Sequence, residues 1–289
     1  MKIKKKWFAL FTVPLISVFF AVVILPFISG ILYSFVKWDG LPKNPKQFVG
    51  LANYLKVFTD SRFLASLLRT SLFTIISMLV INVLALAFAL FVTSRLRARN
   101  LSRAMLFMPY LIGGLLLGYI WQFILGDGMK AIGTLTGRED LFFYWLSDSR
   151  FAFIGMIVVT TWQMAGYIMI IYIAGLQTIS DDVLEAARID GAGFWNLLFR
   201  VKLPLLMPSI TISLFLTLSN CFKIYDVNLS LTGGGPANAT EMVTMNIFAE
   251  IFSKSNYGYG QAKAIVFFVI VAAITMLQVK LTSNKEVEA

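Results

Sequence analysis

Glu185-Ala186-Ala187-Arg188-Ile189-Asp190-Gly191, followed by Val201-Lys202-Leu203-Pro204, is a polar segment set between two long apolar runs. Carboxylates, small residues, a glycine break and a downstream proline are typical of an element that docks, because charged side chains are rare inside membrane spans. The apolar runs on either side indicate the fold class, and the polar segment is the best indicator of the protein's function.

The composition is that of a polytopic membrane protein. Of the 289 residues, 58% are hydrophobic and 14% are charged, whereas soluble domains carry roughly 25% charged residues. Mean hydropathy is +0.78. The net charge of +10 gathers in short clusters beside apolar runs, which favours membrane topology over a nucleic-acid partner. The single cysteine, Cys221, excludes an intrachain disulfide, and the absence of histidine excludes Ser-His triads and His-ligated metals.

Six apolar segments are long enough to cross a bilayer as helices, which takes about 20 mainly apolar residues. They are about Phe8–Val36, Thr70–Val92, Met105–Leu125, Phe151–Gly175, Leu205–Tyr225 and Ala264–Leu281. The sequence therefore predicts an all-α membrane protein with six transmembrane helices in a single domain over residues 1–289. The basic start resembles a signal peptide, but the apolar run after it is too long and lacks an Ala-x-Ala site, so we expect an uncleaved first span.

Basic clusters orient these spans. Lysines precede the first span and arginines fill the loop between the second and third: Lys2, Lys4, Lys5 and Lys6, and Arg95, Arg97, Arg99 and Arg103. Such clusters are expected in the cytoplasm. An even number of spans then places both termini and residues 176–204 on the cytoplasmic side.

The first outer loop is basic too, which runs against this orientation. Its charges are Lys37, Lys43, Lys46, Lys56, Arg62 and Arg69. However, residues 51–58 repeat apolar side chains at helical spacing. We therefore expect an interfacial helix whose lysines reach outward from its apolar face.

Residues 176–204 are predicted to fold as two short helices joined by a turn. Ser180 can cap the first helix, and Gly191 and Gly193 permit a sharp change of direction. Pro204 suits the first turn of the next span, where its missing donor costs nothing. The second helix presents one face at i, i+3, i+4 and i+7, formed by Trp195, Leu198, Phe199 and Lys202.

The charge on this loop favours a protein partner over the lipid surface. An amphipathic connector lying on lipid usually carries Lys and Arg. Here the acidic residues outnumber the basic ones: Asp181, Asp182, Glu185 and Asp190 against Arg188, Arg200 and Lys202. Because carboxylates are repelled by anionic headgroups, we expect this loop to dock on a protein.

The spacing of this loop resembles a known family. Glu185-Ala186-Ala187, Gly191, Val201 and Leu203-Pro204 match the EAA loop of ABC-importer permeases, with Val201 where isoleucine is usual. The string from Glu185 to Ala192 is similar to the carbohydrate-uptake branch, which includes maltose-type and glycerol-3-phosphate-type permeases. So is Leu231-Thr232-Gly233-Gly234-Gly235-Pro236, and the resemblance covers nearly the whole chain.

In that family the loop contains the coupling helix, which sits in a cleft of an ATP-hydrolysing subunit. The resemblance implies that the chain is a non-catalytic permease subunit that binds no cofactor, while the partner uses ATP and Mg²⁺. In agreement, the sequence has no Gly-x4-Gly-Lys-Ser/Thr phosphate loop. The residues given a coupling role are Glu185, Ala186, Ala187, Asp190, Gly191, Leu203 and Pro204.

The resemblance also implies an assembly in the inner or plasma membrane of a bacterial or archaeal cell. Its members are a second permease subunit (a different chain), two cytoplasmic ATPase subunits and an extracytoplasmic solute-binding protein. The implied substrate is a carbohydrate, such as a sugar or an oligosaccharide, and this chain forms half of its pathway through the membrane.

Polar and aromatic residues within the spans are candidate pathway residues, because a sugar needs hydrogen-bonding partners and flat apolar faces. They are Asn220, Lys223, Tyr225, Trp121, Gln122, Trp162 and Gln163, with Lys223 placed at the outer end of its span. The alternatives are interfacial belt residues and helix–helix hydrogen bonds; Asn82 is assigned to the latter. Gly233, Gly234, Gly235 and Pro236 form either a contact with the binding protein or a flexible turn.

Two other classes of protein compete with the importer permease. A stand-alone secondary carrier commonly has internal repeats, and no pairing between halves is visible. A membrane-embedded transferase or protease needs a reactive constellation inside the bilayer, and neither histidine nor a cluster of intramembrane carboxylates supplies one.

Overall fold

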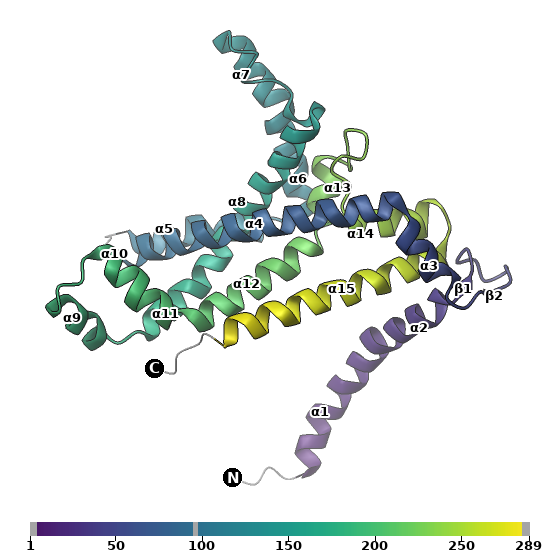
Figure 1. The fold of residues 1–289 in the computed structure, drawn as a ribbon, viewed down its shortest axis with the longest axis horizontal. Coiled ribbons are helices and arrows are strands. Elements are labelled where there is room, and N and C mark those ends of the chain that lie inside the picture. Colours follow the sequence, from purple (N-terminus) through teal and green to yellow (C-terminus); the bar gives the residue numbers. More distant parts are fainter. Residues whose placement is uncertain (1–4, 95–97, 285–289) are drawn as a thin grey trace. The chain divides into compact units, whose positions relative to one another are not determined.

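The structure, a computed structural model, describes residues 5–94 and 98–284 (Figure 1). Within these ranges the chain is helical apart from one pair of short strands, which confirms the predicted all-α class. Some residues of the orienting basic clusters, Lys2, Lys4, Arg95 and Arg97, lie outside the described residues.

The described chain divides into two compact units, which are taken in turn below. The first contains the residues up to 64 together with 246–269, and the second contains 65–245 together with the residues from 270 onward. Helices α4 (Ser61–Thr93), α14 (Val243–Phe248) and α15 (Tyr257–Ser283) continue from one unit into the other. The single domain over residues 1–289 therefore stays a prediction.

The first unit contains the N-terminal helix, the strand pair and the adjoining parts of α4, α14 and α15. Its other elements are α1 (Lys5–Phe19), η1 (Phe20–Ile24), α2 (Leu25–Ser34), β1 (Val36–Lys37), β2 (Gln47–Phe48), α3 (Ala52–Thr59) and η6 (Ala249–Ser253). The strands pair antiparallel, with Val36 opposite Phe48. Helix α3 confirms the helix predicted over residues 51–58, and its interfacial position stays a prediction.

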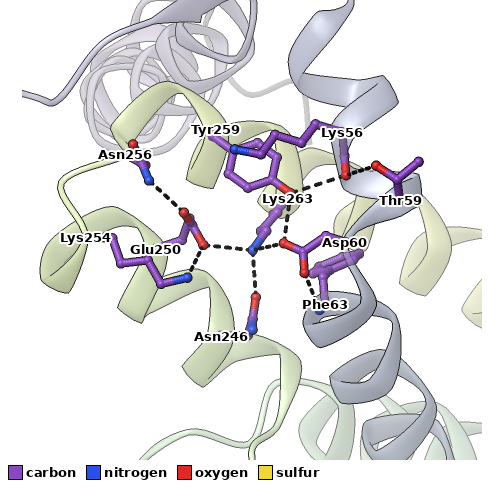
Figure 2. A network of polar contacts seen from close by, with 10 residues as sticks. All are labelled: Lys56, Thr59, Asp60, Phe63, Asn246, Glu250, Lys254, Asn256, Tyr259 and Lys263. Carbon is purple, nitrogen blue, oxygen red and sulfur yellow. Dashed lines mark hydrogen bonds and ion pairs between the residues drawn. The ribbon is translucent and has the colours of Figure 1, made fainter.

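A buried lysine ties the segments of the first unit together (Figure 2). The Lys263 ammonium, on α15, lies 2.8 Å from Oδ2 of Asp60 and 2.9 Å from Oε2 of Glu250. It also donates to Oδ1 of Asn246 at 3.0 Å. Asp60 lies between α3 and α4 and Glu250 lies in η6, so one ammonium joins these segments to the start of α15. Lys263 is 0% exposed, and a charge buried this deeply is tolerated because it is paired and hydrogen-bonded.

Hydrogen bonds keep both carboxylates of this network ionised. Burial raises the pKa of Asp60, but hydrogen bonds from Lys263, the Phe63 N–H and the Tyr259 hydroxyl outweigh it and hold that pKa at about 2. The pKa of Glu250 is also lowered, because its hydrogen bonds outweigh the effect of burial. Both carboxylates therefore stay ionised across the ordinary pH range of growth.

The second unit contains the remaining helices. Besides its parts of α4, α14 and α15, its elements are α5 (Arg99–Phe107), η2 (Met108–Leu111), α6 (Gly114–Phe123), η3 (Ile124–Gly128), α7 (Met129–Thr136), η4 (Trp145–Ser147), α8 (Ser149–Thr178), α9 (Asp181–Ile189), α10 (Phe194–Asn196), η5 (Leu197–Lys202), α11 (Leu203–Leu205), α12 (Met207–Phe222) and α13 (Asp226–Leu231). Helix α12 has the α9–α11 loop before it and α13 after it, so these two regions lie at opposite ends of the unit (Figure 1).

A chain of buried polar side chains joins α4, α8 and α12. Asn82 donates from Nδ2 to the Thr217 hydroxyl at 3.0 Å and accepts from the Tyr172 hydroxyl at 2.8 Å. The Ser213 hydroxyl donates to the Tyr172 oxygen at 2.8 Å. Hydrogen bonds of this kind hold helices together where water is absent. The prediction that Asn82 joins helices is confirmed.

Four helices of the described chain are long and apolar enough to cross a membrane, or up to six if each of two bent pairs counts as one span. The four are Leu10–Ser34, Ser61–Thr93, Ser149–Thr178 and Tyr257–Ser283, and each overlaps a predicted span. The six-span count stays a prediction.

The two remaining predicted spans fall on the bent pairs. Arg99–Leu111 meets Gly114–Thr136 at 97°, because Ile112 and Gly113 adopt extended backbone between them. The second bend, of 73°, follows Leu205, so Pro204 lies before it and Pro208 occupies the first turn of α12. This differs from the expectation that Pro204 begins the span.

We predict that Lys263→Met lowers the free energy of unfolding by about 3–5 kcal/mol, because it leaves the buried Glu250 and half-buried Asp60 carboxylates without the ammonium that they share. Lys254→Met is the matched control, since Lys254 pairs with the same Glu250 carboxylate but its side chain is 45% exposed. It should cost about 0–1 kcal/mol. Thermal unfolding of both variants in one detergent makes the comparison, and equal shifts in Tm would contradict the assignment.

Candidate functional site

The loop between α8 and α12 turns at Gly191. Helix α9 begins after Ser180, which takes the extended cap conformation, although its hydroxyl makes no cap hydrogen bond in the described part of the chain. The helix closes with the Gly191 N–H donating to the Arg188 carbonyl at 3.0 Å and the Ala192 N–H donating to the Ala187 carbonyl at 2.9 Å. Gly191 has φ +83°, a conformation that glycine adopts without a steric penalty. Gly193, at φ −69°, has no such requirement.

Large apolar side chains project from this loop beside carboxylates. Ile189 is 86% exposed, Trp195 is 66% exposed and Phe194 is 65% exposed. The Trp195 ring stacks on Phe199 with centroids 5.8 Å apart. The predicted acidic residues, Asp181, Asp182, Glu185 and Asp190, are all exposed. Exposed apolar groups ringed by charge mark a surface that a partner covers.

A cleft of about 270 Å³ lies on the inner side of this turn. It is lined by Ala187, Asp190, Gly191, Ala192, Asn196, Arg200 and Val201. Among the predicted coupling residues, Glu185 and Ala186 are exposed on α9 next to this cleft, while Leu203 and Pro204 lie in α11, half-buried. The coupling role of these residues remains a proposal.

A second cleft, of about 230 Å³, gathers polar side chains around the C-terminal end of α12. Gln163, Asn220, Lys223 and Tyr225, all predicted pathway residues, line it. Lys223 follows the last residue of α12 and is exposed. Gln163 donates from Nε2 to the Ile112 carbonyl at 3.0 Å, which fixes its amide beside the break between η2 and α6.

The other predicted pathway residues lie elsewhere. Trp121 and Trp162 pack edge to face with ring centroids 5.5 Å apart. Trp162 lines an apolar groove of about 350 Å³ between α4, α5 and α8. Gln122 does not line the polar cleft. The predicted pathway residues therefore fall into two sets, a polar set in the cleft around Lys223 and a more apolar set around Trp121 and Trp162.

Two residues of the polar cleft were missed from the sequence. Tyr110 lines it and stacks on Tyr167 with centroids 4.3 Å apart. Thr160 lines it too, is 4% exposed, and its hydroxyl has no hydrogen-bond partner in the described part of the chain. A buried polar atom without a partner is uncommon and calls for an explanation such as a ligand or water. The three-residue spacing between Thr160 and Gln163 places both on one helix face, which is the signal that could have found Thr160.

The glycine-rich loop is a hydrogen-bonded turn. Gly233 and Gly234 have φ +56° and +83°. The Thr240 N–H donates to the Gly234 carbonyl at 3.1 Å, and the Thr240 hydroxyl donates to the Gly235 carbonyl at 2.7 Å. Buried Asn228, on α13, donates from Nδ2 to the Thr240 carbonyl at 2.8 Å. The backbone is thus internally tied, and a contact of Gly233–Pro236 with a binding protein stays a prediction.

Residues 83–283 match the family model described as "Binding-protein-dependent transport system inner membrane component". The chain belongs to this family. It is therefore a membrane component of a transport system, which rules out the transferase and stand-alone carrier alternatives. Within the described residues no group of three or more His, Cys, Asp or Glu could hold a metal ion.

Similar proteins support this assignment. The probable starch degradation products transport system permease protein AmyD of Thermoanaerobacterium thermosulfurigenes is 44% identical, over 98% of this chain and 96% of its own length. The multiple sugar-binding transport system permease protein MsmF of Streptococcus mutans is 32% identical, over 91% of this chain and 90% of its own. A chain of a bacterial ABC transporter that imports the acidic polysaccharide alginate has the same fold, with a TM-score of 0.81 at 19% identity, covering 96% of this chain and 95% of that one.

We predict that Gly191→Val strains the turn of the α9–α11 loop and weakens association with the ATPase subunit, whereas Gly193→Val is tolerated. A β-branched residue at φ +83° is strained by about 1–3 kcal/mol. In contrast, Gly193 has ordinary backbone and no atom within 4 Å of a built Cβ. Co-purification of the ATPase subunit, with uptake in the same cells, measures the difference. Full subunit association and uptake in the Gly191 variant would remove the main support for a coupling role.

Proposed function

We propose that this chain is one permease subunit of a binding-protein-dependent ABC importer for sugars or oligosaccharides. The observation that carries the proposal is the α9–α11 loop, where exposed Ile189 and Trp195 stand beside exposed carboxylates at a glycine turn. The family description and the names of two similar sugar permeases support it. In this proposal the loop seats in the ATPase subunit, and Glu185, Ala186, Ala187, Asp190, Gly191, Leu203 and Pro204 transmit ATP hydrolysis to the helices.

The polar cleft favours an uncharged sugar as substrate. Its lining contains one ammonium, Lys223, and one carboxylate, Asp226, so its net charge is close to zero. The amides of Gln163 and Asn220 and the stacked ring of Tyr110 add hydrogen-bonding groups and a flat face. A phosphorylated polyol would need a surplus of positive charge. Starch-derived oligosaccharides, which the name of the relative at 44% identity mentions, carry no charge and therefore fit the nearly neutral lining better.

The proposed assembly contains this chain, a second permease subunit of different sequence, two ATPase subunits that use ATP and Mg²⁺, and an extracytoplasmic solute-binding protein. Both termini and residues 176–204 face the cytoplasm of a bacterial or archaeal cell. The glycine-rich turn, at the other end of α12, then faces outward. The basic clusters support this orientation, and the family description supports the binding protein.

The topology predicts opposite labelling of two exposed positions. In a Cys221→Ala background, Asn238→Cys should react with an impermeant thiol reagent added to intact cells, because it lies in the glycine-rich outer loop. Asp182→Cys, on α9, should react only after the membrane is permeabilised. Labelling in the reverse order would overturn the proposed orientation.

The pathway assignment predicts that Lys223→Ala impairs sugar-dependent transport. Losing one hydrogen bond to a charged group costs about 1.5–3 kcal/mol, so half-maximal stimulation of ATPase activity should need on the order of 10–100 times more sugar. Lys130→Ala, on α7 and outside the cleft lining, is the control. The assembled transporter is assayed in proteoliposomes with maltose, longer malto-oligosaccharides, trehalose and glycerol 3-phosphate.

Stimulation by glycerol 3-phosphate alone would contradict the sugar assignment. Equal behaviour of the Lys223 and Lys130 variants would leave Lys223 as an interfacial anchor.

A further inference from the structure

A further cleft lies in the first unit and is lined by none of the residues of the two sites above. Its volume is about 590 Å³. The β1–β2 hairpin, α3 and the turn before α15 form its walls. Lys37, Trp38, Gln47, Lys56, Asn256 and Tyr259 are among the residues that line it. Neither the proposed sugar pathway nor the α9–α11 loop gives this cleft a role.

Ammonium groups are held in place around this cleft by aromatic rings. Lys56 Nζ lies 4.3 Å from the centroid of the Tyr259 ring. Lys46, on the hairpin beside the cleft, places its Nζ 4.6 Å from the Tyr33 ring and 4.5 Å from the Trp38 ring. A cation over a ring face is attracted by its electrons and loses some of its freedom. The cleft therefore presents cations whose positions are fixed in advance.

These same contacts argue against a sugar as the occupant. Sugars bind aromatic residues by lying flat on the ring. The Tyr259 ring has two ammonium groups over it, with Lys56 Nζ 4.3 Å and Lys263 Nζ 4.7 Å from its centroid, which leaves little of the ring for a sugar. What the cleft offers instead is positive charge from Lys37 and Lys56 in its lining and from Lys46 beside it. One lining carboxylate, Asp39, opposes them, and it accepts hydrogen bonds from the Leu41 N–H and from the Asn44 amide. The balance favours a ligand that carries carboxylates.

The cleft and the exposed apolar side chains of α3 lie on different faces of that helix. Leu51, Leu55 and Phe58 form an exposed apolar stripe along α3, each more than 60% exposed. The cleft is lined instead by Ala52, Asn53 and Lys56. At 3.6 residues per turn the two sets lie about 140° apart around the helix. If the apolar stripe rests on the membrane surface, the cleft opens toward water and is turned away from lipid headgroups.

The floor of the cleft is fixed by the buried ion network (Figure 2). The Tyr259 hydroxyl donates to Oδ2 of Asp60 at 2.9 Å, and the Asn256 amide donates to Oε1 of Glu250 at 2.9 Å. Both carboxylates pair with buried Lys263. A partner that presses on this floor therefore contacts side chains tied directly to the beginnings of α4 and α15.

We propose that this basic cleft is a docking site for acidic side chains of the extracytoplasmic solute-binding protein. The inference rests on the proposed function, which supplies both the partner and the outward orientation. Carboxylates entering the cleft form charge-assisted hydrogen bonds with Lys37 and Lys56. Because opposite charges also steer encounter, the contact speeds association, and salt weakens it. Docking at this site engages the helix ends through Tyr259 and Asn256.

The test uses the assembled transporter in nanodiscs and the solute-binding protein that stimulates its ATPase. For Lys37→Glu and for Lys56→Gln we expect roughly a tenfold rise in the concentration of binding protein that gives half-maximal stimulation. Lys43→Glu is the matched control, because Lys43 is an exposed lysine of the same hairpin that does not line the cleft. It should change this concentration less than about twofold, as expected of a charge that only contributes to long-range attraction. The gap between wild type and the cleft variants should close at high salt.

Three outcomes overturn the proposal. One is unchanged stimulation in both cleft variants, and another is an equal effect of Lys43→Glu. The third is an effect that follows the phosphatidylglycerol content of the nanodiscs and not the binding protein, which would assign the cleft to lipid. If no solute-binding protein stimulates the wild-type transporter, the proposed function itself fails, and this result is distinct from the other three.

Discussion

A polar side chain buried in this apolar chain is costly unless it finds a partner within the protein, because hydrocarbon supplies none. Two networks answer that constraint. Asn82, Tyr172 and Ser213 join neighbouring helices in the second unit, and Lys263 joins helix ends in the first. Polar side chains outside these two networks lie at the two candidate sites. Among the residues that the structure describes, the Thr160 hydroxyl has no hydrogen-bond partner in the polar cleft, and the α9–α11 loop exposes carboxylates beside apolar side chains.

The sequence predicted the helices because their signal is local. A long apolar run has a single stable form in a membrane, so composition alone indicates where the long helices lie. The bends were missed for a related reason. Hydropathy averages over residues, whereas the break after Leu111 depends on the backbone angles of Ile112 and Gly113. The turn at Gly191 was predicted because a glycine between two short helices indicates a backbone conformation that other residues adopt only with strain.

Site residues that are close together in the sequence were predicted, and those that only the fold brings together were missed. Lys223, Asn220 and Tyr225 are neighbours in sequence, and the structure places them in one cleft. Tyr110 and Thr160 reach the same cleft from other helices, and only the fold brings them there. The Lys263 network was missed entirely, because Asp60, Glu250 and Lys263 come from distant parts of the chain and none stands out alone.

The exposure of Ile189 and Trp195 has a consequence for the cell. In the proposed orientation, a copy of this subunit that reaches the membrane without its ATPase exposes these apolar side chains to other proteins of the cytoplasm. Such a copy is prone to aggregate and is a natural substrate for quality-control proteases. Under the proposed function, matched synthesis of the two subunits keeps this loop covered.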